Sequence, residues 1–217
     1  MKFRNYQNRT TILIPMRALN EGKSRLSNVL SPSSRSRLVE LLFSQLLKKL
    51  NILRRQFPPI FSDVVVITPC KKVKDLSEEF NAIVLEEPMP NNLNSALTLG
   101  LSWSYENDYN SSLIIPGDII DPLTKDIRKI ITLGKKASEC MIISPSIDFG
   151  TNALFLSLPT RMNLKFGPNS FFEHQKEAAK QSIKTIIAPL DSLKDDLDTA
   201  KDLEKFKIIQ PKFFQSI

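Results

Sequence analysis

Three cations, Arg17, Lys23 and Arg25, follow closely after the apolar run 12–14, which is closed by Pro15. A short apolar run that stops at proline is typical of a buried strand ending at its C-terminal edge. In open α/β sheets, ligands bind beyond the carboxyl ends of the strands. A loop there that carries three cations and a glycine suits the binding of a polyphosphate, although a solvated basic loop has the same composition.

Three aspartates stand where a divalent cation would need them. Asp118 follows the apolar run 113–115 and would project from the C-terminal end of a strand. Asp196 and Asp198 are two positions apart, and in an extended segment this spacing puts both carboxylates on one side. Mg²⁺ binds through one or two carboxylates together with substrate phosphates, so Asp118 with either Asp196 or Asp198 is a candidate metal site. Asp198 alone could instead cap the last predicted helix.

Apolar runs alternate with helical periodicity along the rest of the chain, which predicts an α/β fold with a mostly parallel sheet and helices on both faces. Strands are predicted at residues 12–14, 63–68, 82–85, 113–115, 140–144, 152–156 and 183–187. Helices are predicted at 32–56, 73–80, 93–105, 124–134, 170–181 and 198–206, with a break at 57–59, a turn at 86–92 and a non-helical basic loop after Pro15. No repeat or linker interrupts this alternation, so residues 1–217 are predicted to form one domain.

The composition is that of an ordinary globular protein, with 41% hydrophobic and 24% charged residues. No apolar run reaches the roughly 18 residues of a membrane span. Residues 1–6 lack the apolar core of a signal peptide. Cys70 and Cys140 form no metal or redox spacing, so we expect a cytoplasmic protein with reduced thiols and no membrane partner.

The formal net charge of +7 is unevenly distributed, because the first 57 residues hold twelve Lys or Arg and two acidic residues. A basic segment of this kind indicates anionic ligands, either nucleotide phosphates or nucleic acid. Nucleic-acid binding would need a groove-entering motif or exposed aromatic residues among the cations, and neither is visible. Nucleotide phosphates are therefore favoured, and no nucleic-acid partner is expected.

The chain resembles the 2-phospho-L-lactate guanylyltransferase family, which includes the phosphoenolpyruvate guanylyltransferases and serves the synthesis of the deazaflavin coenzyme F420. The resemblance rests on blocks at 15–19, 23–26, 30–32, 93–97, 118, 150–154, 166–170 and 196–199 with 202–203. Its most specific part is the pair Gly-Thr-Asn-Ala-Leu at 150–154 and Phe-Gly-Pro-x-Ser at 166–170. The chain departs from the family at Met16-Arg17, where Val-Lys is usual, at Asn92, where Gly is usual, and at Ile120, where Pro is usual.

This resemblance implies a Rossmann-like nucleotidyltransferase fold and a reaction in which GTP and a small phosphorylated carboxylic acid give a guanylyl diphosphate ester and pyrophosphate. The acceptor would be 2-phospho-L-lactate, phosphoenolpyruvate or 3-phospho-D-glycerate, and Mg²⁺ the cofactor. The residues implied are Lys23, Arg17 and Arg25 for catalysis; Pro15, Leu93, Asn94 and Ser95 for the nucleotide; Thr151, Gly167 and Ser170 for the acceptor; and Asp118, Asp196 and Asp198 for the metal.

The residues make chemical sense of that reaction. A phosphate monoester has a second pKa of about 6 and is largely dianionic at neutral pH, so the acceptor needs no general base. This agrees with a chain whose single histidine, His174, is expected to face solvent. Phe166, Phe171 and Phe172 are expected in the core.

Other nucleotidyltransferases, of the molybdopterin guanylyltransferase or sugar-nucleotide type, are the alternative. Their first loop generally contains paired glycines, whereas this loop has only Gly22. A homodimer is one open option for the assembly.

Overall fold

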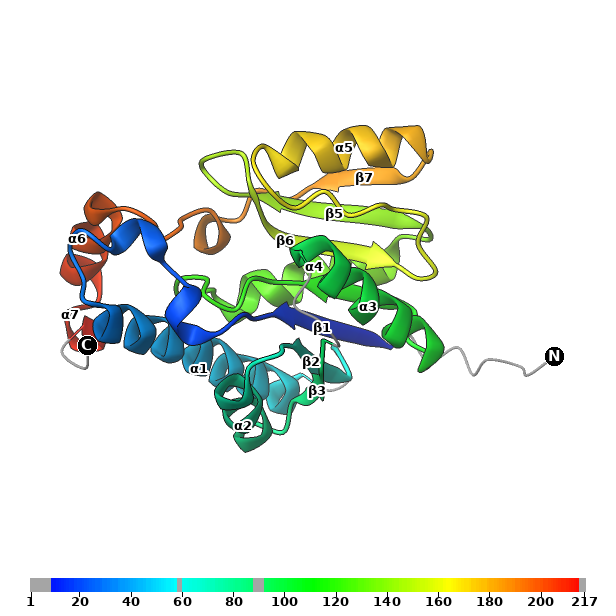
Figure 1. Cartoon of the computed structure of the whole chain (residues 1–217). Coiled ribbons are helices and arrows are strands. Elements are labelled where there is room, and N and C mark those ends of the chain that lie inside the picture. The colour runs from blue at the N-terminus through cyan, green and yellow to red at the C-terminus, as the bar shows by residue number, and fades with distance from the viewer. Residues whose placement is uncertain (1–8, 58–59, 88–91, 215–217) are drawn as a thin grey trace.

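The computed structural model describes residues 9–57, 60–87 and 92–214, and its centre is a seven-stranded sheet in the order β3-β2-β1-β4-β6-β5-β7 (Figure 1). The strands are β1 (Thr10–Pro15), β2 (Asp63–Ile67), β3 (Ile83–Leu85), β4 (Ser111–Ile114), β5 (Cys140–Pro145), β6 (Thr151–Ser157) and β7 (Lys184–Ile187). Within the described residues, only β6 runs antiparallel to its neighbours, β4 and β5. The predicted α/β fold with a mostly parallel, mixed sheet is confirmed.

Central strands are covered on both faces, which explains their uninterrupted apolar runs. In β2, Val64 and Val66 belong to one apolar cluster, and Val65 and Ile67 belong to the other. The first cluster lies under α1 (Pro32–Gln56), α2 (Lys71–Glu79) and α4 (Thr124–Lys136), and the second under α3 (Leu93–Glu106) and α5 (Ser170–Lys180) (Figure 1). The predicted helices on both faces are therefore present.

The start of α1 has the local signals that the sequence predicts. The Ser31 hydroxyl accepts a hydrogen bond from the Ser34 backbone N–H at 3.1 Å, and Pro32 occupies the first helical position. That cap satisfies a backbone donor that the helix itself leaves unpaired. Phe57 ends the helix; residues 58–59 of the predicted break, residues 88–91 of the predicted turn and residues 1–6 lie outside the described part.

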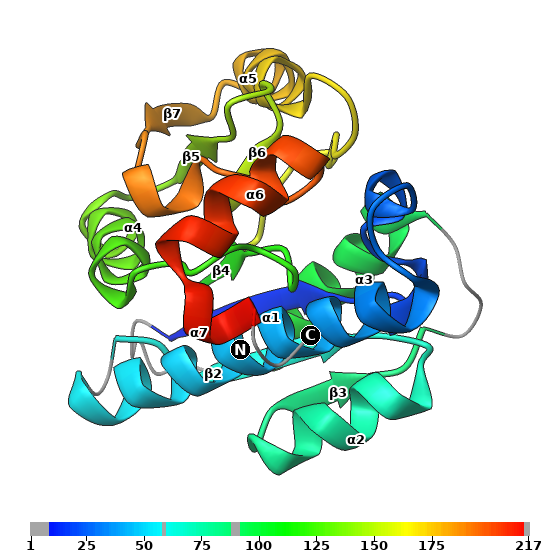
Figure 2. The same cartoon turned by 90° about the vertical axis from the view of Figure 1, so that its left-hand side faces the viewer.

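A third apolar cluster attaches the C-terminal helices α6 (Ala200–Ile209) and α7 (Pro211–Phe214) to α1. Leu203 and Phe206 of α6 pack with Leu38 and Leu42 of α1, and Figure 2 shows α6 and α7 lying beside α1. The prediction that the last helix begins at Asp198 is wrong. The helix begins at Ala200, because the Thr199 side chain caps α6 in a capping box.

The sequence predicts a non-helical basic loop after β1. The structure differs, because this loop contains two short 3₁₀ turns, η1 (Leu19–Glu21) and η2 (Ser24–Leu26). Burial of two apolar side chains accounts for these turns. Leu19 and Leu26 are buried in two different apolar clusters, and the short turns bring both side chains inward. Lys23 stands between the turns with a positive φ of 54°. A further 3₁₀ turn, η3 (Asp191–Leu193), precedes α6.

The strand order changes direction between β1 and β4, which are adjacent and parallel. The chain crosses from β1 to β2 on one side and returns to β4 on the other, so a crevice opens where both strands end. In the described ranges, no helix has the length and apolar character to cross a membrane.

Candidate functional site

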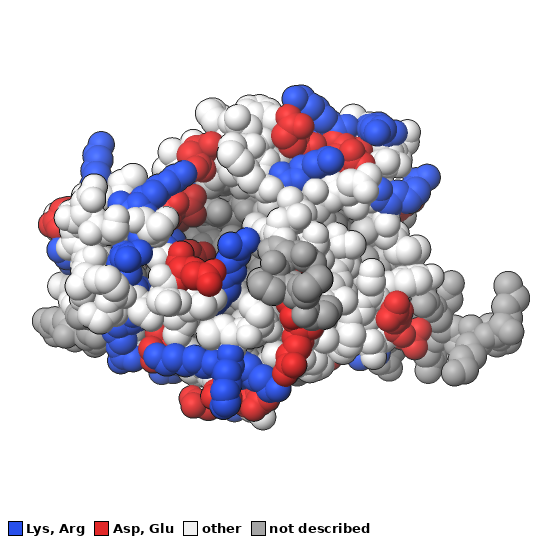
Figure 3. Space-filling model, in the orientation of Figure 1, with Lys and Arg blue, Asp and Glu red and all other residues white. Residues whose placement is uncertain are grey.

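A cleft of about 360 Å³ lies at the carboxyl ends of β1 and β4. Pro15 and Arg17 from the loop after β1, Asp118 from the loop after β4, Leu93 from the start of α3, and Phe166 contribute to its lining. Figure 3 shows acidic and basic side chains gathered around a hollow on this face of the molecule. The arrangement is the one that the apolar runs closed by proline predict.

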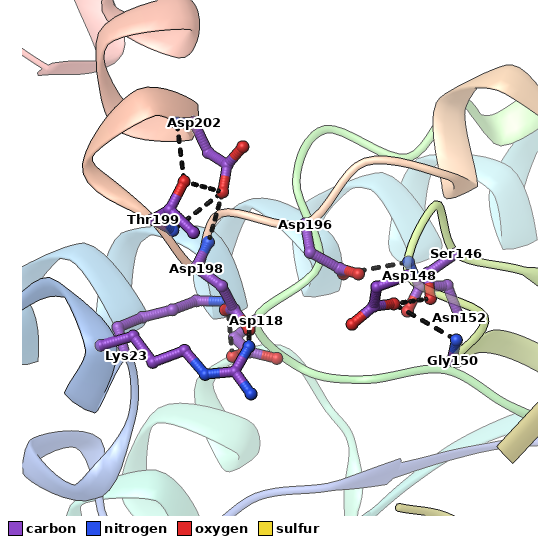
Figure 4. Close-up of polar contacts among 11 residues, drawn as sticks. Lys23, Asp118, Ser146, Asp148, Gly150, Asn152, Asp196, Asp198, Thr199 and Asp202 are labelled. Atoms are coloured by element: carbon purple, nitrogen blue, oxygen red, sulfur yellow. Dashed lines mark hydrogen bonds and ion pairs between the residues drawn. The ribbon is translucent and has the colours of Figure 1, made fainter. Parts of the chain in front are cut away.

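Lys23 is the centre of the charge cluster beside this cleft. Its Nζ lies 2.8 Å from Oδ2 of Asp118 and 3.3 Å from Oδ1 of Asp198 (Figure 4). Arg25 reaches the second oxygen of Asp198, with Nη1 to Oδ2 at 3.5 Å. The Lys23 side chain is only 4% exposed, whereas the two carboxylates are 36% and 39% exposed. Three residues from three distant segments therefore converge on one point.

The ionisation of this cluster follows from its geometry. Burial by itself would lower the pKa of Lys23, but the charges and hydrogen bonds of Asp118 and Asp198 outweigh it and raise that pKa above its ordinary value. Burial would likewise raise the pKa of Asp118, and the Lys23 ammonium instead holds it below its usual value. The Lys23 ammonium and the Asp118 carboxylate therefore stabilise each other's charged form.

Asp196 does not share this cation. Its Oδ1 accepts a hydrogen bond from Nδ2 of Asn152 at 3.0 Å, and its side chain points toward Asn152 and Asp148 (Figure 4). Burial, with further contributions from the charges of Asp198 and Asp148, raises the pKa of Asp196 to about 6. Among the described residues, no three or more His, Cys, Asp or Glu side chains form a group arranged to hold a metal ion.

Of the predicted nucleotide-binding residues, Pro15 and Leu93 line the cleft, whereas Asn94 and Ser95 form hydrogen bonds with other parts of the protein. The Asn94 amide forms two bonds with the Phe166 backbone, donating to its carbonyl at 3.0 Å and accepting from its N–H at 2.8 Å. The backbone N–H of Ser95 donates to Oδ1 of Asn92, the cap of α3. Arg17 is exposed, and its guanidinium forms no hydrogen bond or ion pair with another described residue.

Two of the predicted acceptor-binding residues, Thr151 and Ser170, are brought into direct contact. The Ser170 hydroxyl donates to Thr151 Oγ1 at 3.0 Å, and both side chains are buried. Gly167 has a φ of +143°, and a side chain added there would meet nothing within 4 Å, so this backbone borders open space.

The prediction that His174 faces solvent is wrong, because the side chain is fully buried. It lies one helical turn after Ser170, on the same buried face of α5, and this spacing is the signal that could have revealed it. Burial lowers the pKa of His174 to about 4. Phe166 and Phe171 pack against the second core cluster as expected, whereas Phe172 is 43% exposed and is not a core residue.

The mixed sheet with helices on both faces is the fold of the nucleotidyltransferases, and solved structures share it. The chain superposes on a nucleotidyl transferase from Methanothermobacter thermautotrophicus with a TM-score of 0.64 and 12% identity, covering 97% of this chain and all of that one. It also superposes on CMP:2-keto-3-deoxy-manno-octonic acid synthetase complexed with CTP, with a TM-score of 0.56 and 12% identity, over 94% and 99% of the two chains.

The chain belongs to the family described as guanylyl transferase CofC like, whose model matches residues 10–210. It is 29% identical to a 3-phospho-D-glycerate guanylyltransferase of Colwellia psychrerythraea, over 96% of both chains. It is 30% identical to a 2-phospho-L-lactate guanylyltransferase of Methanothermobacter thermautotrophicus, over 90% of this chain and 82% of that one. A phosphoenolpyruvate guanylyltransferase of Thermobaculum terrenum is 25% identical over 88% and 80% of the two chains. The family resemblance drawn from the sequence is confirmed.

Proposed function

We propose that this chain is a single-domain guanylyltransferase that transfers GMP from GTP to the phosphate of a small phosphorylated carboxylic acid and releases pyrophosphate, in coenzyme F420 synthesis. The observation that carries the proposal is the Lys23–Asp118–Asp198 cluster at the mouth of the cleft. It supplies both signs of charge that a polyphosphate and its counter-cation require. The acceptor is 2-phospho-L-lactate, phosphoenolpyruvate or 3-phospho-D-glycerate, the three acids named for the relatives.

The chain's own residues have a task of positioning and charge neutralisation rather than proton transfer. The acceptor phosphate, with a second pKa of about 6, is already nucleophilic at neutral pH. The single histidine is buried and hydrogen-bonded, which agrees with a reaction that needs no general base. Lys23, Arg17 and Arg25 bind the β- and γ-phosphates and stabilise the charge of the departing pyrophosphate.

Asp118 and Asp198 have the donors and the placement for a divalent cation, which we propose to be Mg²⁺. Their oxygens already converge on one cation, the Lys23 ammonium, and carboxylate oxygens are the ligands that Mg²⁺ prefers. A bound Mg²⁺ supplies neutralisation of phosphate charge at the reacting centre. Asp196, bonded to Asn152, lies on the acceptor side of this pair and is the less favoured ligand.

The two substrates are proposed to occupy adjoining parts of the site. Pro15 and Leu93 line the cleft and contact the nucleotide, with Asn94 and Ser95 supporting that wall from the start of α3. Thr151, Gly167 and Ser170 border the acceptor. We place the enzyme in the cytoplasm, and a homodimer stays a prediction that light scattering checks.

The direct test is product formation from GTP and Mg²⁺ with each of the three acids in turn. Pyrophosphate release is followed by a coupled assay, and the guanylyl diphosphate ester is identified by mass spectrometry. We expect pyrophosphate release only when one of the acids is present, and a preference for GTP over CTP, UTP and ATP. Turnover with a different nucleotide and a sugar phosphate, and none with these acids, would assign the chain to the sugar-nucleotide class instead.

A further inference from the structure

The His174 side chain, on α5, is fully buried, and both of its ring nitrogens have hydrogen-bond partners. Its Nε2 accepts a hydrogen bond from the backbone N–H of Lys165 at 3.0 Å, and its Nδ1 lies 3.2 Å from Oγ1 of Thr151. The imidazole also meets the Phe166 ring edge-on, with 4.8 Å between ring centroids. One side chain therefore joins α5, the first residue of β6 and the segment between them.

These contacts fix the tautomer of the neutral ring. A backbone N–H can only donate, so Nε2 must be the unprotonated nitrogen and Nδ1 must carry the hydrogen. Nδ1–H is then the donor toward Thr151 Oγ1, which also accepts a hydrogen bond from the Ser170 hydroxyl at 3.0 Å. With both donors directed at its oxygen, the Thr151 hydroxyl can donate its own hydrogen to a third group.

The segment held by His174 is a wall of the cleft. Phe166 lines the cleft, and Asn94 grips its backbone N–H and carbonyl from α3 on the opposite side. Gly167, with its φ of +143°, follows directly. The segment is thus held between two helices. On the α5 side, His174 bonds it at Lys165 and Glu177 bonds it at Asn163.

We propose that His174 is a positioning residue for the acceptor side of the site. It holds the backbone at Lys165 in place and leaves the Thr151 hydroxyl able to donate a hydrogen bond to an anion, such as the carboxylate of the acceptor. This assignment to the acceptor rests on the proposed guanylyl transfer. The hydrogen bonds and the ring contact of His174 fall on Thr151 and the 165–166 segment rather than on the loop after β1, so its loss should weaken acceptor binding more than nucleotide binding.

The test compares His174→Ala with His174→Gln, because a glutamine oxygen can reach the position of Nε2 and accept from the Lys165 N–H. Hydrogen–deuterium exchange of residues 163–167 should rise in His174→Ala and return toward the wild-type rate in His174→Gln. In steady-state assays, His174→Ala should raise the acceptor KM by about ten- to hundred-fold, whereas the calorimetric Kd for GTP should stay within about two-fold. Gln175→Ala is the matched control, since the hydrogen bond that the Gln175 side chain donates, to the Phe171 carbonyl, lies within α5.

If His174 merely stabilised the fold, its replacement by alanine would weaken the binding of both substrates and lower kcat together. The difference between the acceptor KM and the GTP Kd would then be absent, and so would the recovery in His174→Gln. Unchanged exchange of residues 163–167 in His174→Ala would overturn the anchoring role. Equal losses for GTP and acceptor would overturn the assignment to the acceptor side. If the wild-type protein turns over none of the three acids, the proposed function fails, and the exchange data alone still decide whether His174 holds the segment.

Discussion

Replacing Lys23 by methionine removes the cation that stands between Asp118 and Asp198. The ammonium lies 2.8 and 3.3 Å from their oxygens, and the Lys23 side chain is almost fully buried. Methionine retains most of the apolar length of lysine and leaves the packing of the loop largely intact. The variant therefore tests charge rather than volume.

The expected loss of stability is modest because water reaches more than a third of each carboxylate. Breaking a fully buried ion pair costs about 3–5 kcal/mol, and exposure reduces that figure toward the small values of surface pairs. We expect a fall of about 1–2 kcal/mol in the free energy of unfolding, which for a chain of this size corresponds to a Tm lower by roughly 2–8 °C.

Lys23→Met should change the affinities for a divalent cation and for GTP in opposite directions. In the wild-type protein, a divalent cation must displace the Lys23 ammonium before it can bind Asp118 and Asp198. We expect Lys23→Met to bind Mn²⁺ alone about ten-fold more tightly, a gain of about 1.4 kcal/mol. GTP should bind about ten-fold more weakly, because a charged contact with its phosphates is lost.

Isothermal titration calorimetry and Mn²⁺ electron paramagnetic resonance measure both affinities in the same preparation. Lys49→Met is the matched control, since Lys49 pairs with Asp121 in the loop after β4 and does not contact Asp118. Weaker or unchanged Mn²⁺ binding in Lys23→Met would refute the reasoning, as would an equal gain of Mn²⁺ affinity in Lys49→Met.

Four further outcomes are expected. Asp118→Asn removes a negative charge at nearly constant volume, so pyrophosphate release at saturating Mg²⁺ should be abolished while circular dichroism stays unchanged. Gly167→Ala places a side chain at a φ of +143°, a strain of about 1–3 kcal/mol without a clash, and should raise the acceptor KM and leave the GTP Kd unchanged in calorimetry. Because the pKa of His174 is about 4 in the folded chain and 6.5 is its ordinary value, the unfolded chain binds more protons between these pH values. The free energy of unfolding, measured with urea, should therefore be unaffected by His174 above pH 6.5 and should fall by up to about 3 kcal/mol as the pH drops to 4, and the fall should be smaller in His174→Gln. Thr199→Ala removes the capping box formed with Asp202 and should cost about 1 kcal/mol, seen as a Tm lower by roughly 2–4 °C.

Each of these outcomes has a result that contradicts it. Wild-type rates in Asp118→Asn would exclude that carboxylate from the metal site. Loss of GTP binding in Gly167→Ala would move the turn to the nucleotide. If the free energy of unfolding of His174→Gln fell by the same amount between pH 6.5 and 4, the loss of stability would belong to other groups. An unchanged Tm in Thr199→Ala would mean that the cap contributes little to the stability of the fold.

The sequence by itself determined the elements and the edge of the sheet where the site lies. Continuous β-branched runs such as 64–67 are buried on both faces, and a proline after the first and fourth runs marks the ends of β1 and β4. Ser31 and Pro32 define the start of α1. These are local signals, because a strand, a cap or a break depends on residues within a few positions of one another, and they placed Lys23 and Asp118 at one edge.

Only the tertiary structure decided which side chains meet. Lys23 joins Asp198 across 175 positions, and Asn94 joins Phe166 across 72. The periodicity of a sequence does not reveal contacts between such distant positions, so the sequence left Asp196 and Asp198 as alternative metal ligands. His174 was expected in solvent because a lone histidine in a charged helix has no apolar signal of its own. It is buried because Thr151 and the Lys165 backbone, distant along the chain, satisfy both of its nitrogens once the sheet and α5 have packed.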